Sequence, residues 1–177
     1  MQEIASSPVK QRQDPLCARY RGTASDALIT DGARTINNCT EDPFHGAVVI
    51  GAENGVPWRF GIHPAVGGYH DLPNPGDLLC AALSSCLDAT LRMIADRLGI
   101  GLEWLDVTTA ADCDVRGALL VDRRVPVGFQ RVECRVRLRA PDGDAARLPM
   151  LVAAAEHSCV VLQTLRGGIA ARVHLEQ

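Results

Sequence analysis

The 177-residue chain has few aromatic residues, which make up 4% of it, and a formal net charge of only −3. A scarcity of aromatic side chains argues against a platform on which nucleic-acid bases stack. A weak negative charge argues against a surface for nucleic acid or anionic lipid. We therefore expect no nucleic-acid partner and no membrane partner.

Several motifs are missing as well. The sequence has no run of eighteen apolar residues and no apolar centre of a secretory signal near its N-terminus, so we expect a cytoplasmic protein without a transmembrane segment. It has no C-x-x-C pair, which argues against a structural zinc site, and no G-x-S-x-G motif, which argues against a serine hydrolase. We expect neither a metal nor a cofactor.

Cysteine, by contrast, is plentiful, with seven residues spread singly along the chain. An odd number of scattered cysteines does not suit a disulfide framework, and thiols are the default state in the cytosol. The hydrophobic content of 47% supports one domain with its own core. Residues 1–33 are polar and interrupted by Ser-Pro, Asp-Pro and Asp-Gly, which predicts an extended, partly mobile arm before a folded domain over residues 34–177.

The longest element that the sequence predicts is a helix over residues 74–99. Asn74 suits the N-cap, Pro75 the first helical position, and Gly99 the C-terminal end. Cys86 lies at the middle of an apolar face, whose members recur at three- and four-residue spacing: Leu79, Ala82, Leu83, Cys86, Thr90, Met93 and Ile94. The simplest explanation of such a cysteine is a buried core residue.

Alternating apolar and polar residues predict strands on both sides of this helix. Asn54-Gly55 predicts a hairpin between strands at 47–51 and 58–62. Further strands are expected near residues 34–39, 107–115, 129–140 and 169–176, and a second helix near 149–166. This order of elements predicts an α+β fold with a largely antiparallel sheet.

The second predicted helix carries Cys159 on its apolar face, as the first carries Cys86. If the two faces pack together, the sulfurs come close to one another. A pair of thiols within disulfide reach supports one definite reaction, in which a thiolate attacks a peroxide, becomes a sulfenic acid and condenses with the second thiol. An apolar wall would favour alkyl or fatty-acid hydroperoxides over hydrogen peroxide.

The sequence resembles the OsmC/Ohr family of cysteine-based organic hydroperoxide reductases in two motifs, NPGDLLCAALSSC with LDATL, and AAEHSCVVLQTLRGGI. The segment GGYHDLPNPGDLL resembles the OsmC-like branch of the family. The resemblance as a whole covers residues 34–177. It implies an OsmC-like fold, with an antiparallel sheet packed against two central helices in an intertwined homodimer. It also implies that Cys86 is the peroxidatic thiol, that Cys159 is the resolving thiol, and that a dithiol such as a lipoyl-protein is the reductant.

The chain departs from the family in what activates the thiol. The family has a glutamate ten residues before the first cysteine, and Gly76 stands there; the proline that commonly follows the second cysteine is Val160 here. The family's activating arginine comes from the loop before the second strand, where this chain reads EDPFH over residues 41–45. The remaining candidates for activating the thiol or binding substrate are His45, Arg59, His70, Asp77 and His157.

Two functions stay open on these grounds. The first is a thiol-dependent peroxidase that reduces organic hydroperoxides to alcohols in oxidative-stress defence, through a Cys86 sulfenic acid resolved by Cys159. The second is an OsmC-fold dimer without peroxidase turnover, which binds a hydrophobic ligand or senses redox state. The cysteine pair favours the first function, and the missing glutamate and arginine favour the second.

Overall fold

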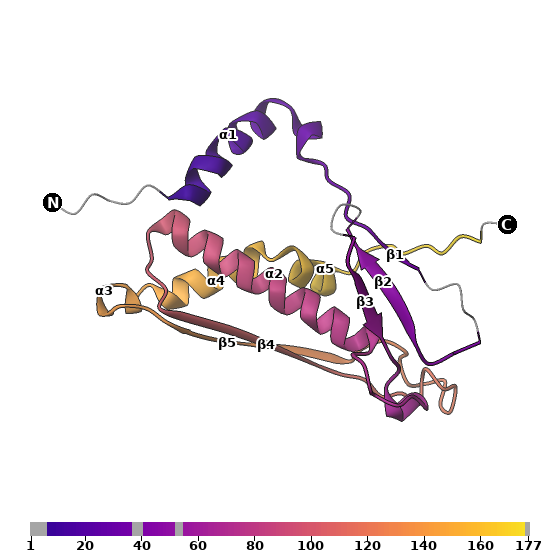
Figure 1. Ribbon diagram of the computed structural model, residues 1–177. Helices are drawn as coiled ribbons and strands as arrows, with labels where there is room; N and C mark the ends of the chain where they lie inside the picture. Colours follow the sequence, from indigo (N-terminus) through magenta and orange to yellow (C-terminus); the bar gives the residue numbers. More distant parts are fainter. Residues whose placement is uncertain (1–6, 37–40, 52–54, 176–177) are drawn as a thin grey trace. The chain divides into compact units, whose positions relative to one another are not determined.

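The computed structural model of the protein describes residues 7–36, 41–51 and 55–175. Its helices are α1 (Pro8–Gly22), α2 (Pro75–Leu98), α3 (Asp142–Ala145), α4 (Leu148–Ser158) and α5 (Val160–Gly167), with short 3-10 turns η1 (Ala24–Ala27) and η2 (Pro64–Val66) (Figure 1). Its strands are β1 (Ala33–Thr35), β2 (Gly46–Ile50), β3 (Pro57–Phe60), β4 (Trp104–Asp112) and β5 (Arg131–Arg139).

The chain divides into two compact units. Unit 1 consists of residues 1–14, 82–108 and 134–177, and unit 2 of residues 15–81 and 109–133. The helix α2 and the strands β4 and β5 each begin in one unit and end in the other.

The predicted long helix is confirmed as α2, and its N-terminus is capped on both sides. The Asn74 side-chain oxygen accepts a hydrogen bond from the Gly76 backbone N–H at 2.8 Å, and the Asp77 carboxylate accepts one from the Asn74 backbone N–H at 2.9 Å. This reciprocal pair satisfies donors that a helix start leaves free. At the other end Gly99 has a φ of +60°, a left-handed conformation that glycine adopts without strain.

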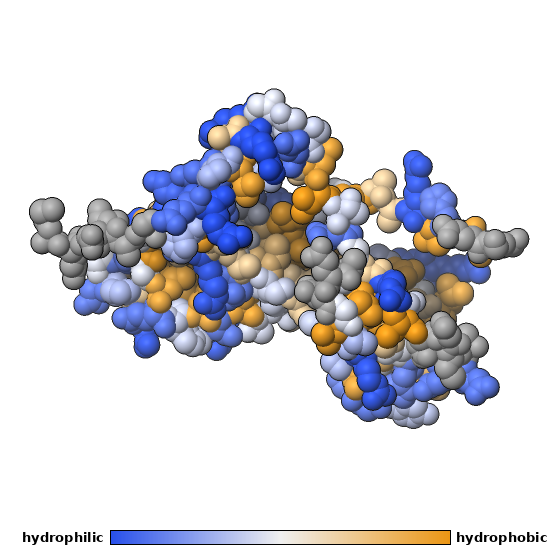
Figure 2. All heavy atoms as spheres, turned by 45° about the horizontal axis from the view of Figure 1, so that its top comes forward, coloured by the Kyte–Doolittle hydropathy of each residue, from blue (hydrophilic) through white to orange (hydrophobic). Residues whose placement is uncertain are grey.

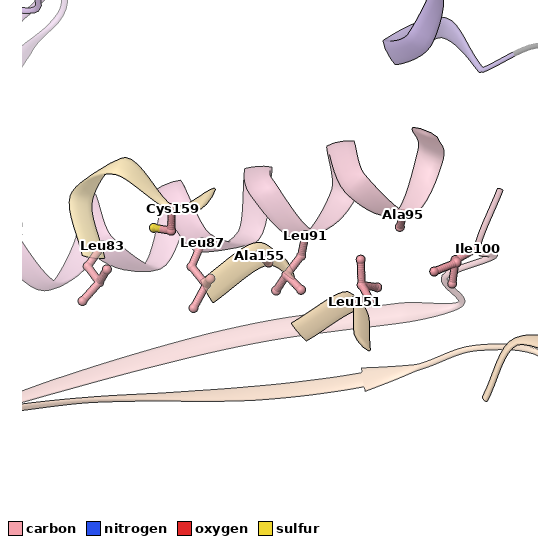
Figure 3. Packing of buried hydrophobic residues seen from close by; sticks show 8 residues of the cluster. All are labelled: Leu83, Leu87, Leu91, Ala95, Ile100, Leu151, Ala155 and Cys159. Atoms are coloured by element: carbon pink, nitrogen blue, oxygen red, sulfur yellow. The ribbon is translucent and has the colours of Figure 1, made fainter. Parts of the chain in front are cut away.

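The core of unit 1 lies between α2 and α4. Its buried members are Leu83, Leu87, Leu91, Ala95, Ile100, Leu151, Ala155 and Cys159 (Figure 3). The buried face of α2 contains every fourth residue from Leu83 to Ala95. It is rotated from the predicted face, because Met93, which was expected on that face, is 40% exposed. Apolar residues of β4 and β5 pack against the same cluster, which explains why these strands alternate.

The strands form two sheets. The sheet of unit 2 has the antiparallel order β1-β2-β3, with Gly46 opposite Phe60. This pairing confirms the predicted hairpin, whose Asn54 lies outside the described residues. The second sheet pairs β4 with β5, and bonds from Glu103 to Arg139 and from Gln130 to Asp112 at its two ends make it antiparallel. The predicted mixture of helices with antiparallel sheet is confirmed.

Two predictions about the C-terminal region are wrong. The second helix is not continuous, because α4 ends at Ser158 and α5 begins at Val160 with a bend of 61°. The segment that follows Gly168 forms no strand up to Leu175, although its pattern alternates. A strand needs a neighbour to bond with, and this segment leaves α5 as an exposed extended chain (Figure 1), with Val173 99% exposed.

The prediction of an extended N-terminal arm is also wrong, because residues 8–22 form α1. The Ser-Pro pair at residues 7–8 starts this helix instead of interrupting it, since proline suits the first helical turn. The Asp96 carboxylate of α2 accepts hydrogen bonds from the Ser7 hydroxyl and from the Val9 N–H, and Arg97 pairs with Asp14 at 2.8 Å. The Ser7 hydroxyl in turn caps the helix locally by accepting a hydrogen bond from the Lys10 N–H at 2.9 Å, so the start signal was present in the sequence and was interpreted as a break.

Apolar side chains reach the surface in several places (Figure 2). Among the described residues, α2 is long and apolar enough to cross a bilayer, and so are α4 and α5 if the bent pair is counted as one element. Helices at the core of soluble proteins have the same length and composition, so this is weak evidence for a membrane span.

Candidate functional site

The two candidate catalytic cysteines both belong to unit 1. Cys86 lies on α2, is half-buried, and packs against the core cluster that contains Cys159. Cys159 has no exposed surface and stands alone between α4 and α5. Both are thiols, as are the other described cysteines. The structure therefore brings together the two side chains that the sequence paired.

Burial raises the pKa of the Cys159 thiol, because the thiolate would lose its hydration in the core. The nearby Cys86 side chain raises that pKa further. The backbone N–H groups of Leu162 and Val161, in the first turn of α5, lie close enough to oppose these effects, although no hydrogen bond of normal geometry from this turn caps the sulfur. The net result is a thiol that stays protonated at neutral pH.

The place of the family's glutamate is filled by another side chain. A Cβ atom on Gly76 would stand 3.1 Å from the ring of Phe129 and 2.9 Å from the Asn74 side-chain oxygen. A longer side chain built on this Cβ has to displace either the ring or the helix cap. Asp77 is the neighbouring carboxylate, but it is engaged in the cap with Asn74. Neither position offers a carboxylate that is free to hold an arginine.

His45 is held between two carboxylates in unit 2. Its Nδ1 lies 2.7 Å from Asp42, and its Nε2 lies 3.0 Å from Asp71. The hydrogen bond with Asp42 and then that with Asp71 raise the pKa of His45, and both carboxyl groups have a lowered pKa in return. The Tyr69 ring stacks on the imidazole. The two carboxylates thus favour the charged form of His45, and both of its ring nitrogens are occupied.

The other candidates are dispersed. Arg59 acts on Asp71 electrostatically, so it belongs to the same surface cluster of unit 2. His70 has a φ of +55° and packs edge-on against His63, with ring centres 5.3 Å apart. His157 lies on α4 in unit 1 and is exposed. Of the five candidates, only His157 shares a unit with the two cysteines.

An open groove of about 1080 Å³ lies in unit 1 between β5 and α4. Apolar side chains from both elements line it, among them Val136, Leu138 and Val152, together with Trp104. Arg137 also lines it and forms no ion pair among the described residues, whereas Arg139 pairs with Glu103 at 2.9 Å. Within the described part of the chain, no three His, Cys, Asp or Glu side chains are grouped so that they could hold a metal ion.

The sequence did not predict which side chains contact His45 and the Gly76 position. Asp42 and Asp71 are 29 residues apart in the chain, and Phe129 is 53 residues from Gly76, so no local pattern links them. The sequence predicted one helix near residues 149–166, so it did not indicate that Gln163 contacts Glu156 across a bend. The signal that was available is the EDPFH text itself, in which a carboxylate precedes a histidine by three residues.

The profile of the family described as OsmC-like protein matches residues 68–174, more than half of the chain. No curated protein sequence matches the chain. Among solved structures, an organic hydroperoxide resistance protein OsmC from Legionella pneumophila is 21% identical with a TM-score of 0.58, over 79% of this chain and 91% of that one.

Two further solved structures have the same fold. An organic hydroperoxide resistance protein from Elizabethkingia anophelis is 22% identical with a TM-score of 0.57, over 80% of this chain and 91% of that one. An OsmC-like protein of unknown function from Vibrio cholerae is 12% identical with a TM-score of 0.62, over 77% and 94%. At these identities the likeness establishes the fold alone.

Proposed function

Since the chain belongs to the OsmC-like protein family, we propose that it is a thiol-dependent peroxidase that reduces alkyl or fatty-acid hydroperoxides in oxidative-stress defence. The observation that carries this proposal is the pair of thiols in unit 1, which come from two packed helices and are close enough for Cys86 to raise the pKa of Cys159. Two similar structures bear the name organic hydroperoxide resistance protein, which supports this class of substrate.

The proposed reaction has two chemical steps on the protein. The Cys86 thiolate attacks the outer oxygen of the hydroperoxide, the S–O bond forms, the O–O bond breaks, and the alkoxide takes a proton to leave as the alcohol. The Cys159 thiolate then attacks the sulfenic sulfur, and hydroxide leaves and becomes water as the disulfide forms. An external dithiol of the lipoyl type returns both thiols and is itself oxidised to a disulfide.

Burial supports this division of roles. Cys86 is half-buried, so a small peroxide has a route to it, whereas Cys159 has no exposed surface. A buried thiol with a raised pKa is a poor first nucleophile in bulk solvent, but it is protected from unrelated oxidants until its partner has reacted. The order in which Cys86 reacts first and Cys159 second follows.

We also propose that the protein is a homodimer. The C-terminal segment exposes Ile169, Val173 and Leu175 at 75%, 99% and 84%, in the alternating pattern of a strand. Apolar residues this exposed at a regular spacing are typical of an interface. We expect more than about 2,000 Å² of total buried surface between two copies, the scale of obligate dimers. Sedimentation that gives a stable 19 kDa monomer at micromolar concentration would contradict this.

A second function remains a candidate because of two observations. The Phe129 ring and the Asn74 cap occupy the space that a side chain at position 76 would enter. The groove between β5 and α4 has apolar walls and is large enough for a small hydrophobic molecule. These observations favour a dimer that binds a hydrophobic ligand, or senses redox state, without turnover.

One titration separates the two functions. Free thiols are counted by mass spectrometry before and after one equivalent of cumene hydroperoxide, in the wild type and in Cys86→Ser, with Cys113→Ser as the control because Cys113 is an exposed cysteine of unit 2. We expect the wild type and the control to lose two thiols and form a bond between Cys86 and Cys159. No loss of thiols at pH 9, with Cys86 reduced at the start, would exclude the peroxidase.

A further inference from the structure

The bend between α4 and α5 centres on Cys159. This residue is the only one between the two helices, and its φ of −72° and ψ of 108° are extended. Its N–H closes the last turn of α4 on Ala155 at 2.9 Å, and its carbonyl opens the first turn of α5 to Gln163 at 2.9 Å. Any change in the bend therefore moves the sulfur.

Two side chains of α5 reach back across the bend to Glu156. The Gln163 amide donates to the Glu156 backbone carbonyl at 2.8 Å, and the Arg166 guanidinium pairs with the Glu156 carboxylate at 2.5 Å. The Glu156 carbonyl is one of the last four of α4, which have no partner within the helix, so the Gln163 bond satisfies it.

These contacts belong to the bent form. On a straight helix Gln163 would stand about 10 Å and Arg166 about 15 Å along the axis from Glu156, and an amide side chain does not span the shorter of these distances. Only a bend brings the start of α5 beside the last turn of α4. The two contacts are therefore a clamp on the bend.

We propose that Glu156, Gln163 and Arg166 are positioning residues, which hold the bend between α4 and α5 and thereby place the Cys159 sulfur for bond formation with Cys86. This inference rests on the proposed function only in its second step, the formation of the disulfide. The clamp acts through Cys159 and touches no reacting atom.

The clamp is suited to positioning more than to stability. The Glu156 and Arg166 side chains are 47% and 52% exposed, and ion pairs this open to water add little to the free energy of unfolding. A short bond across a bend nevertheless restricts the angle between two helices. Its loss is expected to change the geometry at Cys159 while the fold persists.

The test measures the Cys86–Cys159 disulfide directly, without peroxide. Purified wild type, Gln163→Leu, Arg166→Gln and Arg166→Lys are equilibrated in glutathione buffers of graded redox ratio, and the linked peptides are quantified by mass spectrometry. The matched control is Arg92→Gln, which breaks an exposed ion pair with Asp88 on α2. Thermal melting monitors the fold of each variant.

We expect Gln163→Leu and Arg166→Gln to need an oxidising ratio about fivefold higher for half-formation of the disulfide, because a loosened bend lowers the effective concentration of the two thiols. Arg166→Lys, which keeps the charge, and Arg92→Gln are expected to stay within about twofold of the wild type. After cumene hydroperoxide, the first two variants should also retain more Cys86 sulfenic acid, while peroxide consumption in the first step is unchanged.

The outcomes separate this inference from the proposed function. A wild type that forms the disulfide in glutathione but consumes no hydroperoxide excludes the peroxidase and leaves the variants to decide the clamp. Equal redox midpoints in wild type, Gln163→Leu and Arg166→Gln overturn the clamp, as does a wild type that forms no Cys86–Cys159 disulfide. If Gln163→Leu does not fold, the comparison of Arg166→Gln with Arg166→Lys decides, because that side chain is exposed.

Discussion

The surroundings of Cys159 in unit 1 and of His45 in unit 2 are opposite in kind. Cys159 has no exposed surface and is enclosed by aliphatic side chains, and its neutral form is favoured. The His45 side chain is 23% exposed between two carboxylates, and its charged form is favoured. The same chain thus favours the protonated form of a thiol in a dry environment and the protonated form of an imidazole in a partly exposed one.

These opposite surroundings have opposite effects on the charged form of each side chain. A thiol in the core is protected and positioned, but it gains little help in becoming a thiolate. The charged form of His45 is stabilised by Asp42 and Asp71, and both ring nitrogens already have partners. The proposed disulfide formation in unit 1 is therefore expected to depend on pH through Cys159, whereas unit 2 holds a charged surface cluster.

The largest effect is expected from removing Cys159, the proposed resolving thiol. Cys159→Ser should abolish catalytic turnover, yet still consume one equivalent of cumene hydroperoxide, because the first step needs only Cys86. A dimedone-type reagent followed by mass spectrometry should trap the sulfenic acid on Cys86. Cys17→Ser, which changes an exposed cysteine of unit 2, should keep full turnover. Sustained turnover in Cys159→Ser would mean that another thiol resolves the intermediate.

The pH dependence of disulfide formation is the next effect in size. Because burial raises the pKa of Cys159, its thiolate is the minor form at neutral pH and grows as pH rises. The rate at which the free Cys86 sulfenic acid disappears should therefore increase about tenfold per pH unit from pH 6 to 8. Quenched time courses measure it, with Cys159→Ser as the variant that lacks this dependence. A rate that does not change with pH over this range would mean that Cys159 is already ionised.

A smaller effect, on the free energy of unfolding, is expected at Gly76 in unit 2, the position of the family's glutamate. Gly76→Ala should lower the free energy of unfolding by about 1 kcal/mol, since its Cβ crowds Phe129 and the helix cap and this outweighs the helix propensity of alanine. Gly143→Ala, where a Cβ meets nothing within 4 Å, is the control and should not destabilise. Urea unfolding of both variants measures the difference. Full stability of Gly76→Glu would show that the ring moves aside freely.

The smallest effect concerns the charge of His45. Its pKa should lie above the ordinary histidine value in an NMR titration, and Asp42→Asn should lower it more than Asp71→Asn, because Asp42 is the stronger cause. His63→Gln, which leaves both aspartates in place, is the control. Equal pKa values for His45 in wild type and Asp42→Asn would contradict the placement of His45 between the two aspartates.

The same cluster should influence stability with a definite sign. A raised pKa in the folded state means that His45 stabilises the fold below its unfolded pKa and loses this contribution as pH rises through the folded value. Asp42 and Asp71 have lowered pKa values, so they stabilise above their unfolded pKa and lose the contribution as pH falls. The stabilising contribution of the cluster is therefore largest between the unfolded pKa of aspartate and the unfolded pKa of histidine.

Where a local pattern decided the structure, the sequence was a good guide. The caps of α2 involve Asn74 and Asp77, only three residues apart, and its end is a single glycine. The hairpin of β2 and β3 and the alternation of β5 likewise depend on neighbours in the chain. The two cysteines could be paired because both lie on apolar helix faces, which must be buried somewhere.

Tertiary contacts decided the rest. Asp96 of α2 binds the start of α1 in addition to its local Ser7 cap, and Glu156 contacts both Gln163 and Arg166 across the bend at Cys159. Asp71 adds to the effect of the nearby Asp42 in raising the pKa of His45. By itself the sequence determined α2, the hairpin of β2 and β3, the strands β4 and β5, and the two thiols that face the core. The alternating pattern after Gly168 did not suffice, because no described strand pairs with it. Only the tertiary structure decided how these thiols differ in burial and that the pKa of Cys159 is raised, because burial is a property of what packs around a side chain and not of the order of residues beside it.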